Sequence, residues 1–319
     1  MIARVEFAHL PTPIEELPRL TKFLHGPKLF VKRDDQTGLA FGGNKTRKLE
    51  FLLADAFSKD AKTLLAAGAG QSNHCRQTAA AAARFGLDCV LVLVGKDPAF
   101  HSANLLLDDL FGAKIIWVED RADRDKVLQQ TFDQLSAAGK APYLVPYGGS
   151  NPIGAMGYSN ALLEFISQNI RVDWIIVASS SGGTQAGLAC KAHLVNFQGR
   201  ILGISIDESK KDLQTHVAQL ASAVSVLEGK PAIILPDEIL VNDEYCSAGY
   251  GVFTELERNA IKLFAEYEGL LLDPVYTGRA AGGLLDLIDG GFFRSSDRVL
   301  FWHTGGQPAL FASAYTGTR

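Results

Sequence analysis

Residues 174–187 read WIIVASSSGGTQAG, an apolar run that passes directly into a turn rich in serine and glycine. The first five residues suit a strand that is buried on both faces. The glycines let the backbone turn sharply, so that a helix can begin near Gln185. Free amides at such a helix start, with the helix dipole, bind a phosphate group without a lysine. Taken alone, the segment is equally compatible with an ordinary strand-to-helix turn.

Two other phosphate sites agree less well with this segment. A dinucleotide site is favoured by Asp207 and Glu208, which follow the next apolar run. However, the turn spells Gly-Gly-x-x-x-Gly and not the Gly-x-Gly-x-x-Gly of such sites. A Walker A loop is excluded because no Gly-Lys-Ser/Thr follows.

The alternation of apolar runs and helical stretches extends along the whole chain. Runs that suit buried strands occur at residues 28–32, 63–67, 88–94, 114–118, 174–178, 201–206 and 298–302. Stretches rich in alanine and leucine, such as residues 77–85 and 102–111, lie between them. This pattern predicts an α/β fold of parallel sheets covered by helices.

One segment indicates a boundary between two domains. Residues 142–157 are rich in glycine, proline, serine and asparagine, which is typical of a crossing between structural units. We therefore expect a small α/β domain at residues 46–150. A large domain would combine residues 1–45 with residues 151–319.

Composition narrows the class of protein. The 319 residues are 47% hydrophobic, which is enough for a sizeable core, and the net charge of −4 comes without a basic tail. Nucleic acid and anionic membranes are therefore not expected partners, and no apolar run reaches the ~20 residues of a membrane span. The N-terminus lacks an apolar signal core. The four cysteines are scattered along the chain: Cys75, Cys89, Cys190 and Cys246. Their spacing is not that of metal ligands, so we expect no metal site. We expect them to be reduced, which favours a cytoplasmic location.

A lysine flanked by glycines supplies a candidate nucleophile. Residues 42–48 read GGNKTRK and open an amphipathic helix, with Lys45 at its start. An aldehyde cofactor needs a primary amine, and burial or a nearby cation would lower the pKa of that amine so that it can attack. Taken alone, Lys45 is more simply interpreted as a solvated basic residue at the start of a helix. The phosphate-type turn at residues 179–184 makes the nucleophile interpretation stronger.

A second strand-to-helix turn is a candidate anion site. Residues 68–74 read GAGQSNH, in which Ser72 and Asn73 are good N-cap types. Such a turn either only caps its helix or also binds a substrate carboxylate. His74 could donate to that carboxylate or pack in the first helical turn. The neighbouring Cys75 is expected to pack.

Five motifs in one order resemble a known family: GGNKTRK at 42–48, QSNH at 71–74, SGGTQAG at 181–187, DPVYTG at 273–278 and HTGG at 303–306. The chain resembles the pyridoxal-phosphate enzymes of the tryptophan synthase β-like fold, also called fold type II. Within them it is similar to the branch of D-cysteine desulfhydrase and 1-aminocyclopropane-1-carboxylate deaminase. The resemblance implies two open, mostly parallel twisted sheets, pyridoxal 5'-phosphate in the cleft between the domains, and a homodimer.

The resemblance also implies roles for single residues. Lys45 would form the Schiff base and exchange protons with the substrate Cα, and Asn73 would contact the phenolic oxygen of the cofactor. The phosphate would be held by Ser181, Gly182, Gly183 and Thr184. The substrate carboxylate would be bound by Ser72, Asn73 and His74. Tyr250 and Tyr276 match the two active-site tyrosines of the branch, and with Ser72 they are the expected catalytic hydroxyls.

Two positions distinguish reactions within the branch. The cyclopropane deaminases have Glu after the second tyrosine and Leu after the later histidine, whereas this chain has Thr277 and Thr304. A carboxylate at the pyridine nitrogen would keep that nitrogen protonated and strengthen the electron sink, which opening of the cyclopropane ring should demand. A threonine hydroxyl favours a less charged nitrogen, which should suffice for β-elimination of a good leaving group such as a thiolate. Thr304 is therefore the expected partner of the pyridine nitrogen, and Thr277 is expected at the substrate.

These residues favour a lyase that converts D-cysteine to pyruvate, ammonia and hydrogen sulfide. The alternatives are a 1-aminocyclopropane-1-carboxylate deaminase, or a lyase acting on L-cysteate or D-serine. Residues 95–105 form a shorter segment than the resemblance to D-cysteine desulfhydrases implies, which leaves the exact substrate open. The handedness of the substrate depends on the face of the cofactor that Lys45 and the tyrosines occupy, which the sequence does not fix. Outside this class, a dinucleotide oxidoreductase and a non-catalytic cofactor-binding protein remain alternatives.

Overall fold

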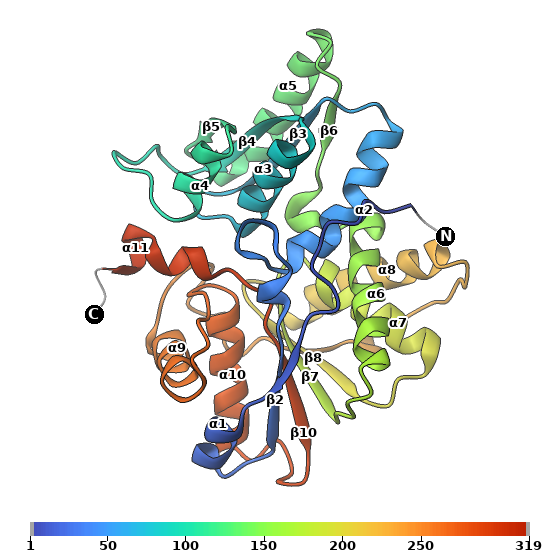
Figure 1. The fold of residues 1–319 in the computed structure, drawn as a ribbon, viewed down its shortest axis with the longest axis vertical. Helices are drawn as coiled ribbons and strands as arrows, with labels where there is room; N and C mark the ends of the chain where they lie inside the picture. Colours follow the sequence, from blue (N-terminus) through green and yellow to red (C-terminus); the bar gives the residue numbers. More distant parts are fainter. Residues whose placement is uncertain (1–2, 317–319) are drawn as a thin grey trace.

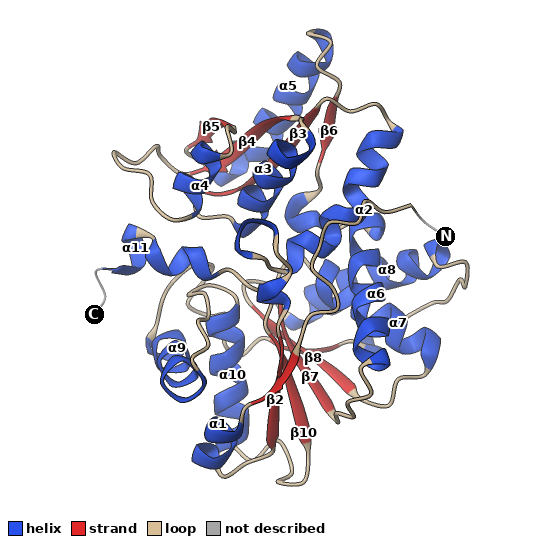
Figure 2. Ribbon diagram, in the orientation of Figure 1, coloured by secondary structure: helices blue, strands red, loops and turns tan. Residues whose placement is uncertain are grey.

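The larger of two sheets forms the centre of the computed structural model, which describes residues 3–316 (Figures 1 and 2). Its strand order is β1-β2-β10-β7-β8-β9, and only β1 runs antiparallel to its neighbour. The strands are β1 (Ile14–Glu16), β2 (Lys28–Lys32), β7 (Trp174–Ser179), β8 (Arg200–Ser205), β9 (Leu240–Asn242) and β10 (Arg298–Trp302).

A smaller, fully parallel sheet has the order β5-β4-β3-β6. Its strands are β3 (Thr63–Ala69), β4 (Asp88–Val94), β5 (Lys114–Val118) and β6 (Pro142–Leu144). All four lie within residues 46–150, the range expected for the small domain. Helix α2 (Asn44–Ser58) packs against helices of both regions, so the domain boundaries stay a prediction.

Helices cover both faces of each sheet (Figure 2). In the larger sheet, α1 (Pro18–Leu24), α9 (Glu255–Glu268) and α10 (Thr277–Asp289) share one apolar core with the strands. On the other side lie α6 (Pro152–Ser167), α7 (Gly183–Val195) and α8 (Lys210–Leu227). The smaller sheet packs against α3 (Asn73–Phe85), α4 (Asn104–Leu110) and α5 (Arg124–Ala137), and α11 (Ser313–Thr316) lies near the described C-terminus. Within residues 3–316, no helix is both long and apolar enough to cross a bilayer.

The predicted α/β class and all seven predicted strands are confirmed, but three strands of three residues each escaped prediction: β1, β6 and β9. The segment 142–157 runs from β6 of the smaller sheet to α6 beside the larger sheet. Asn151 caps α6, and Pro152 occupies the first helical turn. Proline is favoured there because its missing N–H would have no helical partner. The Asn-Pro pair therefore marks a helix start.

Asp34, in the turn after β2, gathers hydrogen bonds from distant segments of the chain. Its fully buried carboxylate accepts from Arg47 Nε and Nη2 at 2.9 and 2.8 Å, and from the Thr12 hydroxyl at 2.8 Å. Tyr158 of α6 donates at 2.6 Å, and Trp302 of β10 at 2.8 Å. Burial alone would raise the pKa of Asp34, but Arg47 and these bonds hold it at about 2.

A second carboxylate completes this buried cluster. Glu164 of α6 accepts from Arg47 Nη1 at 2.8 Å and from Lys32 Nζ at 2.6 Å. Lys32 also donates to the Thr12 carbonyl at 2.7 Å. The cluster therefore ties β2, α6 and the first turn of α2 together, and α2 is the helix on which Lys45 lies.

We expect Asp34→Asn to lower the free energy of unfolding by about 3 kcal/mol, because the amide leaves the Arg47 charge and two other donors poorly paired. Urea unfolding at neutral pH measures this change. The stability that Asp34 contributes is complete above its unfolded pKa of 3.8 and is lost as the pH falls towards 2.

The matched control is Glu16→Gln, which removes an exposed ion pair with Lys28. Such pairs contribute about 1 kcal/mol or less. Equal losses in the two variants would contradict a structural role for Asp34.

Candidate active site

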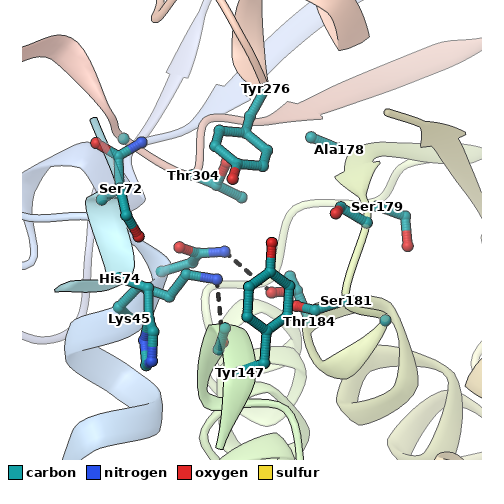
Figure 3. A pocket seen from close by; sticks show the side chains of 16 residues that line it. Lys45, Ser72, His74, Tyr147, Ala178, Ser179, Ser181, Thr184, Tyr276 and Thr304 are labelled. Atoms are coloured by element: carbon teal, nitrogen blue, oxygen red, sulfur yellow. Dashed lines mark hydrogen bonds between the residues drawn. The ribbon is translucent and has the colours of Figure 1, made fainter. Parts of the chain in front are cut away.

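A cavity lies where the two sheets face each other. Its walls come from the starts of α2 and α10 and from the turns after β3, β6, β7 and β10 (Figure 3). Ligands of α/β sheets bind at such carboxyl ends of strands. Nine of the predicted site residues line this cavity: Lys45, Ser72, Asn73, His74, Ser181, Gly182, Thr184, Tyr276 and Thr304.

Lys45 is a half-buried residue whose amine has a pKa that is low for a lysine. Burial lowers it from 10.5 to about 8, so a substantial fraction is neutral near pH 8. Its Nζ donates to the Gly148 carbonyl at 3.0 Å. Gly148 has a φ of 62°, and a Cβ at that position would collide with the Ser181 hydroxyl. Only glycine therefore lets the backbone approach this closely to both Lys45 and Ser181.

Lys48, one helical turn beyond Lys45, is a site residue that the sequence analysis missed. Its Nζ donates to the same Gly148 carbonyl and to the Ser150 hydroxyl, both at 3.1 Å. Ser150 in turn lies 2.8 Å from the Ser181 hydroxyl. Burial and the nearby Lys45 charge hold the pKa of Lys48 well below its usual range. The spacing of three residues was the available signal, because residues i and i+3 share one face of a helix.

The turn after β7 has the geometry of an anion cradle. Gly182 adopts a φ of 73° and precedes α7, a helix of 13 residues whose positive end faces the cavity. Asn44 donates to the Thr184 hydroxyl at 3.1 Å, and the buried Ser179 hydroxyl has no hydrogen-bond partner among residues 3–316. Gly183 was predicted to hold the phosphate. In the structure its N–H donates instead to the Ser150 hydroxyl and to the Ser181 carbonyl.

The turn after β3 presents further polar groups to the cavity. Ser72 caps α3 by accepting from the Cys75 amide at 3.2 Å, as its N-cap type predicts. Both ring nitrogens of His74 are buried and lack a hydrogen-bond partner in the described part of the chain. Burial, with the lysine charges, holds the pKa of His74 well below its usual range, so the ring is neutral. Cys75 packs as expected, and burial raises the pKa of its thiol.

The two predicted tyrosines form a pair of which only one member reaches the cavity wall. Their hydroxyl oxygens lie 2.6 Å apart, and Tyr276 lines the cavity with Tyr250 behind it. Burial raises the pKa of both hydroxyls. A third tyrosine, Tyr147, enters the cavity from the opposite side, with its hydroxyl turned towards that of Tyr276 (Figure 3). Sequence reasoning missed Tyr147 because its segment was interpreted as a domain crossing.

The two threonines that distinguish reactions occupy different environments. Thr304 lines the cavity, and its backbone carbonyl accepts from the Asn44 amide at 2.9 Å. Thr277 is fully buried, and its hydroxyl donates to Asp273 at 2.7 Å. The Asp273 carboxylate also accepts from the amides of residues 275–277 and thereby caps α10. The structure corrects the expectation that Thr277 contacts substrate, because capping already engages its hydroxyl.

A family model described as pyridoxal-phosphate-dependent enzyme matches residues 5–305. The chain belongs to this family. The match overturns the alternative of a dinucleotide oxidoreductase and confirms the expected enzyme class, a pyridoxal-phosphate-dependent lyase.

Solved structures support the family and the fold. A structure described as an ACC deaminase homologue is 36% identical, covers 97% of this chain and 94% of its own, and superposes with a TM-score of 0.90. A hydrogen sulfide-producing enzyme from Fusobacterium nucleatum is 16% identical over 93% of this chain and 96% of its own, with a TM-score of 0.66. A fungal L-serine ammonia-lyase from Rhizomucor miehei is 16% identical over 98% of both chains, with a TM-score of 0.68. The last two indicate the shared fold alone, and the predicted fold type II is confirmed.

The residues on the cavity wall fit pyridoxal phosphate. The Lys45 amine, with its lowered pKa, and a helix start that can hold a phosphate face the same space. The unpartnered Ser179 hydroxyl and His74 ring supply further polar groups there. These features derive from contacts in this chain and do not depend on the comparisons.

We expect the cofactor-free protein to take up pyridoxal phosphate faster as the pH rises through about 8, because only the neutral Lys45 amine attacks the aldehyde. Visible absorbance after rapid mixing measures the rate. Lys59→Ala, at an exposed lysine just past the end of α2, should leave the profile unchanged. A rate that still climbs near the ordinary lysine pKa of 10.5 would contradict the assigned environment.

Proposed function

We propose that the enzyme catalyses α,β-elimination on a small amino acid, with D-cysteine as the substrate that the site favours. The products would be pyruvate, ammonia and hydrogen sulfide. Thr304 supports this proposal most directly, because it supplies a neutral side chain on the cavity wall that also carries Lys45 and Tyr276.

The proposed cofactor contacts follow from the cavity wall. Lys45 would hold the aldehyde carbon, Asn73 the phenolic oxygen, and the turn at residues 181–184 the phosphate. Lys48 and Ser150 brace that turn through the hydrogen bond to Ser181. When bound, pyridoxal phosphate supplies an electron sink for the charge that develops at the substrate Cα.

The turn after β3 is the proposed site of the substrate carboxylate. Ser72 accepts from the Cys75 amide, which leaves its O–H free to donate. The positive end of α3 and the unpaired, neutral His74 add to the attraction for an anion. Asn73, in the same helical turn, lies within the proposed carboxylate site as well. A small carboxylate bound here would place its Cα near Lys45, which lines the same cavity.

Proton transfer can be assigned from the pKa shifts. Lys45, with its pKa of about 8, is the proposed base that takes the Cα proton onto Nζ. Burial and Tyr250 hold the pKa of Tyr276 well above its usual range, so this phenol keeps its proton. Tyr276 is therefore suited to stabilise the leaving hydrosulfide by donating a hydrogen bond to it, while Tyr250 holds the Tyr276 hydroxyl in place through their own hydrogen bond. The 2-aminoacrylate released would hydrolyse to pyruvate and ammonia.

The second candidate function is deamination of 1-aminocyclopropane-1-carboxylate, which the description of the 36% identical structure favours. That reaction should need an acid at the pyridine nitrogen. Thr304 offers a hydroxyl, and Thr277 is engaged by Asp273. Lyases for L-cysteate or D-serine remain within the same proposal.

We also propose a homodimer in the cytoplasm, as the family resemblance and the cysteine content imply.

We expect D-cysteine to yield sulfide and pyruvate in equal amounts from the holoenzyme. The assay panel contains D- and L-cysteine, D-serine, β-chloro-D-alanine, L-cysteate and 1-aminocyclopropane-1-carboxylate, with sulfide and each keto acid quantified. Lys45→Ala should lower turnover by more than roughly 1,000-fold. Lys59→Ala should keep full activity, because this lysine is exposed. Keto acid from the cyclopropane alone, without sulfide from either cysteine, would contradict the proposal.

A further inference from the structure

Asn104, the first residue of α4, is fully buried against the turn that carries Asn73. Its side-chain Nδ2 donates to the Gln71 carbonyl at 2.8 Å and to Asn73 Oδ1 at 3.0 Å. Asn104 does not line the cavity itself, so any effect on the reaction would act through its neighbour.

The backbone fixes the orientation of both amides. A carbonyl oxygen only accepts hydrogen bonds, so the group of Asn104 that faces the Gln71 carbonyl must be the NH₂. The second hydrogen of this NH₂ needs an acceptor, which is Asn73 Oδ1. The Asn73 NH₂ must then point away from Asn104. A Cβ built on Gly306 would lie 2.8 Å from Asn73 Nδ2, which places this donor beside the turn after β10.

A second set of bonds fastens Asn104 to the same turn. Its backbone N–H donates to Gln71 Oε1 at 3.0 Å, and Gln71 Nε2 donates to the Ser102 carbonyl at 3.1 Å. The segment at residues 95–105 thus ends in hydrogen bonds to the turn that precedes Asn73. The hydrogen bonds of the Asn104 side chain and of its backbone N–H therefore hold Asn104 in one orientation against this turn.

We propose that Asn104 is a positioning residue that keeps the NH₂ of Asn73 turned towards the cofactor. The inference rests on the proposed contact between Asn73 and the phenolic oxygen. With this orientation Asn73 donates to an oxygen that carries negative charge. With the opposite orientation its carbonyl would face that oxygen and repel it. The donor stabilises the phenolate, and it thereby lowers the pH at which the visible absorption of the bound cofactor changes.

Asn104→Asp and Asn104→Ala both remove the donor to Asn73, with different effects on packing. In each holoenzyme we expect the spectral midpoint to rise by about one pH unit and the cofactor to bind roughly tenfold more weakly. Absorbance titration and equilibrium dialysis measure these changes, and thermal unfolding confirms that each variant is folded. Leu110→Ser, at a residue of α4 that is 71% exposed, is the matched control and should leave the midpoint unchanged.

A double-mutant cycle separates positioning from a merely structural role. Asn73→Ala should raise the midpoint by itself, and adding Asn104→Asp should then change it no further, because the partner is gone. Additive shifts would overturn the inference. So would an unchanged midpoint in both Asn104 variants while Asn73→Ala shifts it. If Asn73→Ala leaves the midpoint unchanged, the proposed cofactor contact of Asn73 fails as well, and this pattern distinguishes the two failures.

Discussion

The buried carboxylate of Asp34 is the constraint on which the arrangement of the site depends. Five hydrogen bonds from four side chains converge on it, and they come from the N-terminal segment, α2, α6 and β10. A buried charge is tolerated only when it is fully paired, so these segments must meet in one geometry. Arg47 supplies two of these five bonds and the opposite charge, and it lies two residues after Lys45 on the same helix. The position of the reactive amine is therefore set by electrostatics outside the cavity.

Hydrogen bonds between Lys45 and its neighbours in the cavity then determine the chemistry of the site. Lys45 and Lys48 both donate to the Gly148 carbonyl, so two amines lie close together and both have lowered pKa values. Ser150 connects this pair to the anion-binding turn through Ser181. On the opposite side, Asn104 holds the turn that carries Ser72 and Asn73. The cavity thus combines a reactive amine with preorganised donors, which is what amino-acid chemistry on pyridoxal phosphate requires.

The sequence predicted those features that depend on local pattern. Buried strands, the helix opened at Lys45 and the cap at Ser72 follow from apolar runs and from residues with strong turn or capping preferences. The three-residue strands were not predictable, because so short a run carries no periodicity. Lys48 was missed although it lies one helical turn from Lys45, and Tyr147 was missed because its segment was interpreted as a domain crossing. Asn104 could not be found, because its contacts join distant segments. The misplacement of Thr277 was avoidable, since Asp273 four residues earlier is a capping signal that can be read from the sequence.

Reduction of the holoenzyme with borohydride, followed by digestion and mass spectrometry, tests the central claim most directly. The amines of Lys45 and Lys48 donate to the same carbonyl, so the experiment must distinguish lysines three residues apart. The geometry predicts that the pyridoxyl group is attached to Lys45, which lines the cavity, and that Lys48 is unmodified. Attachment to Lys48 or to any other lysine would contradict the assigned site.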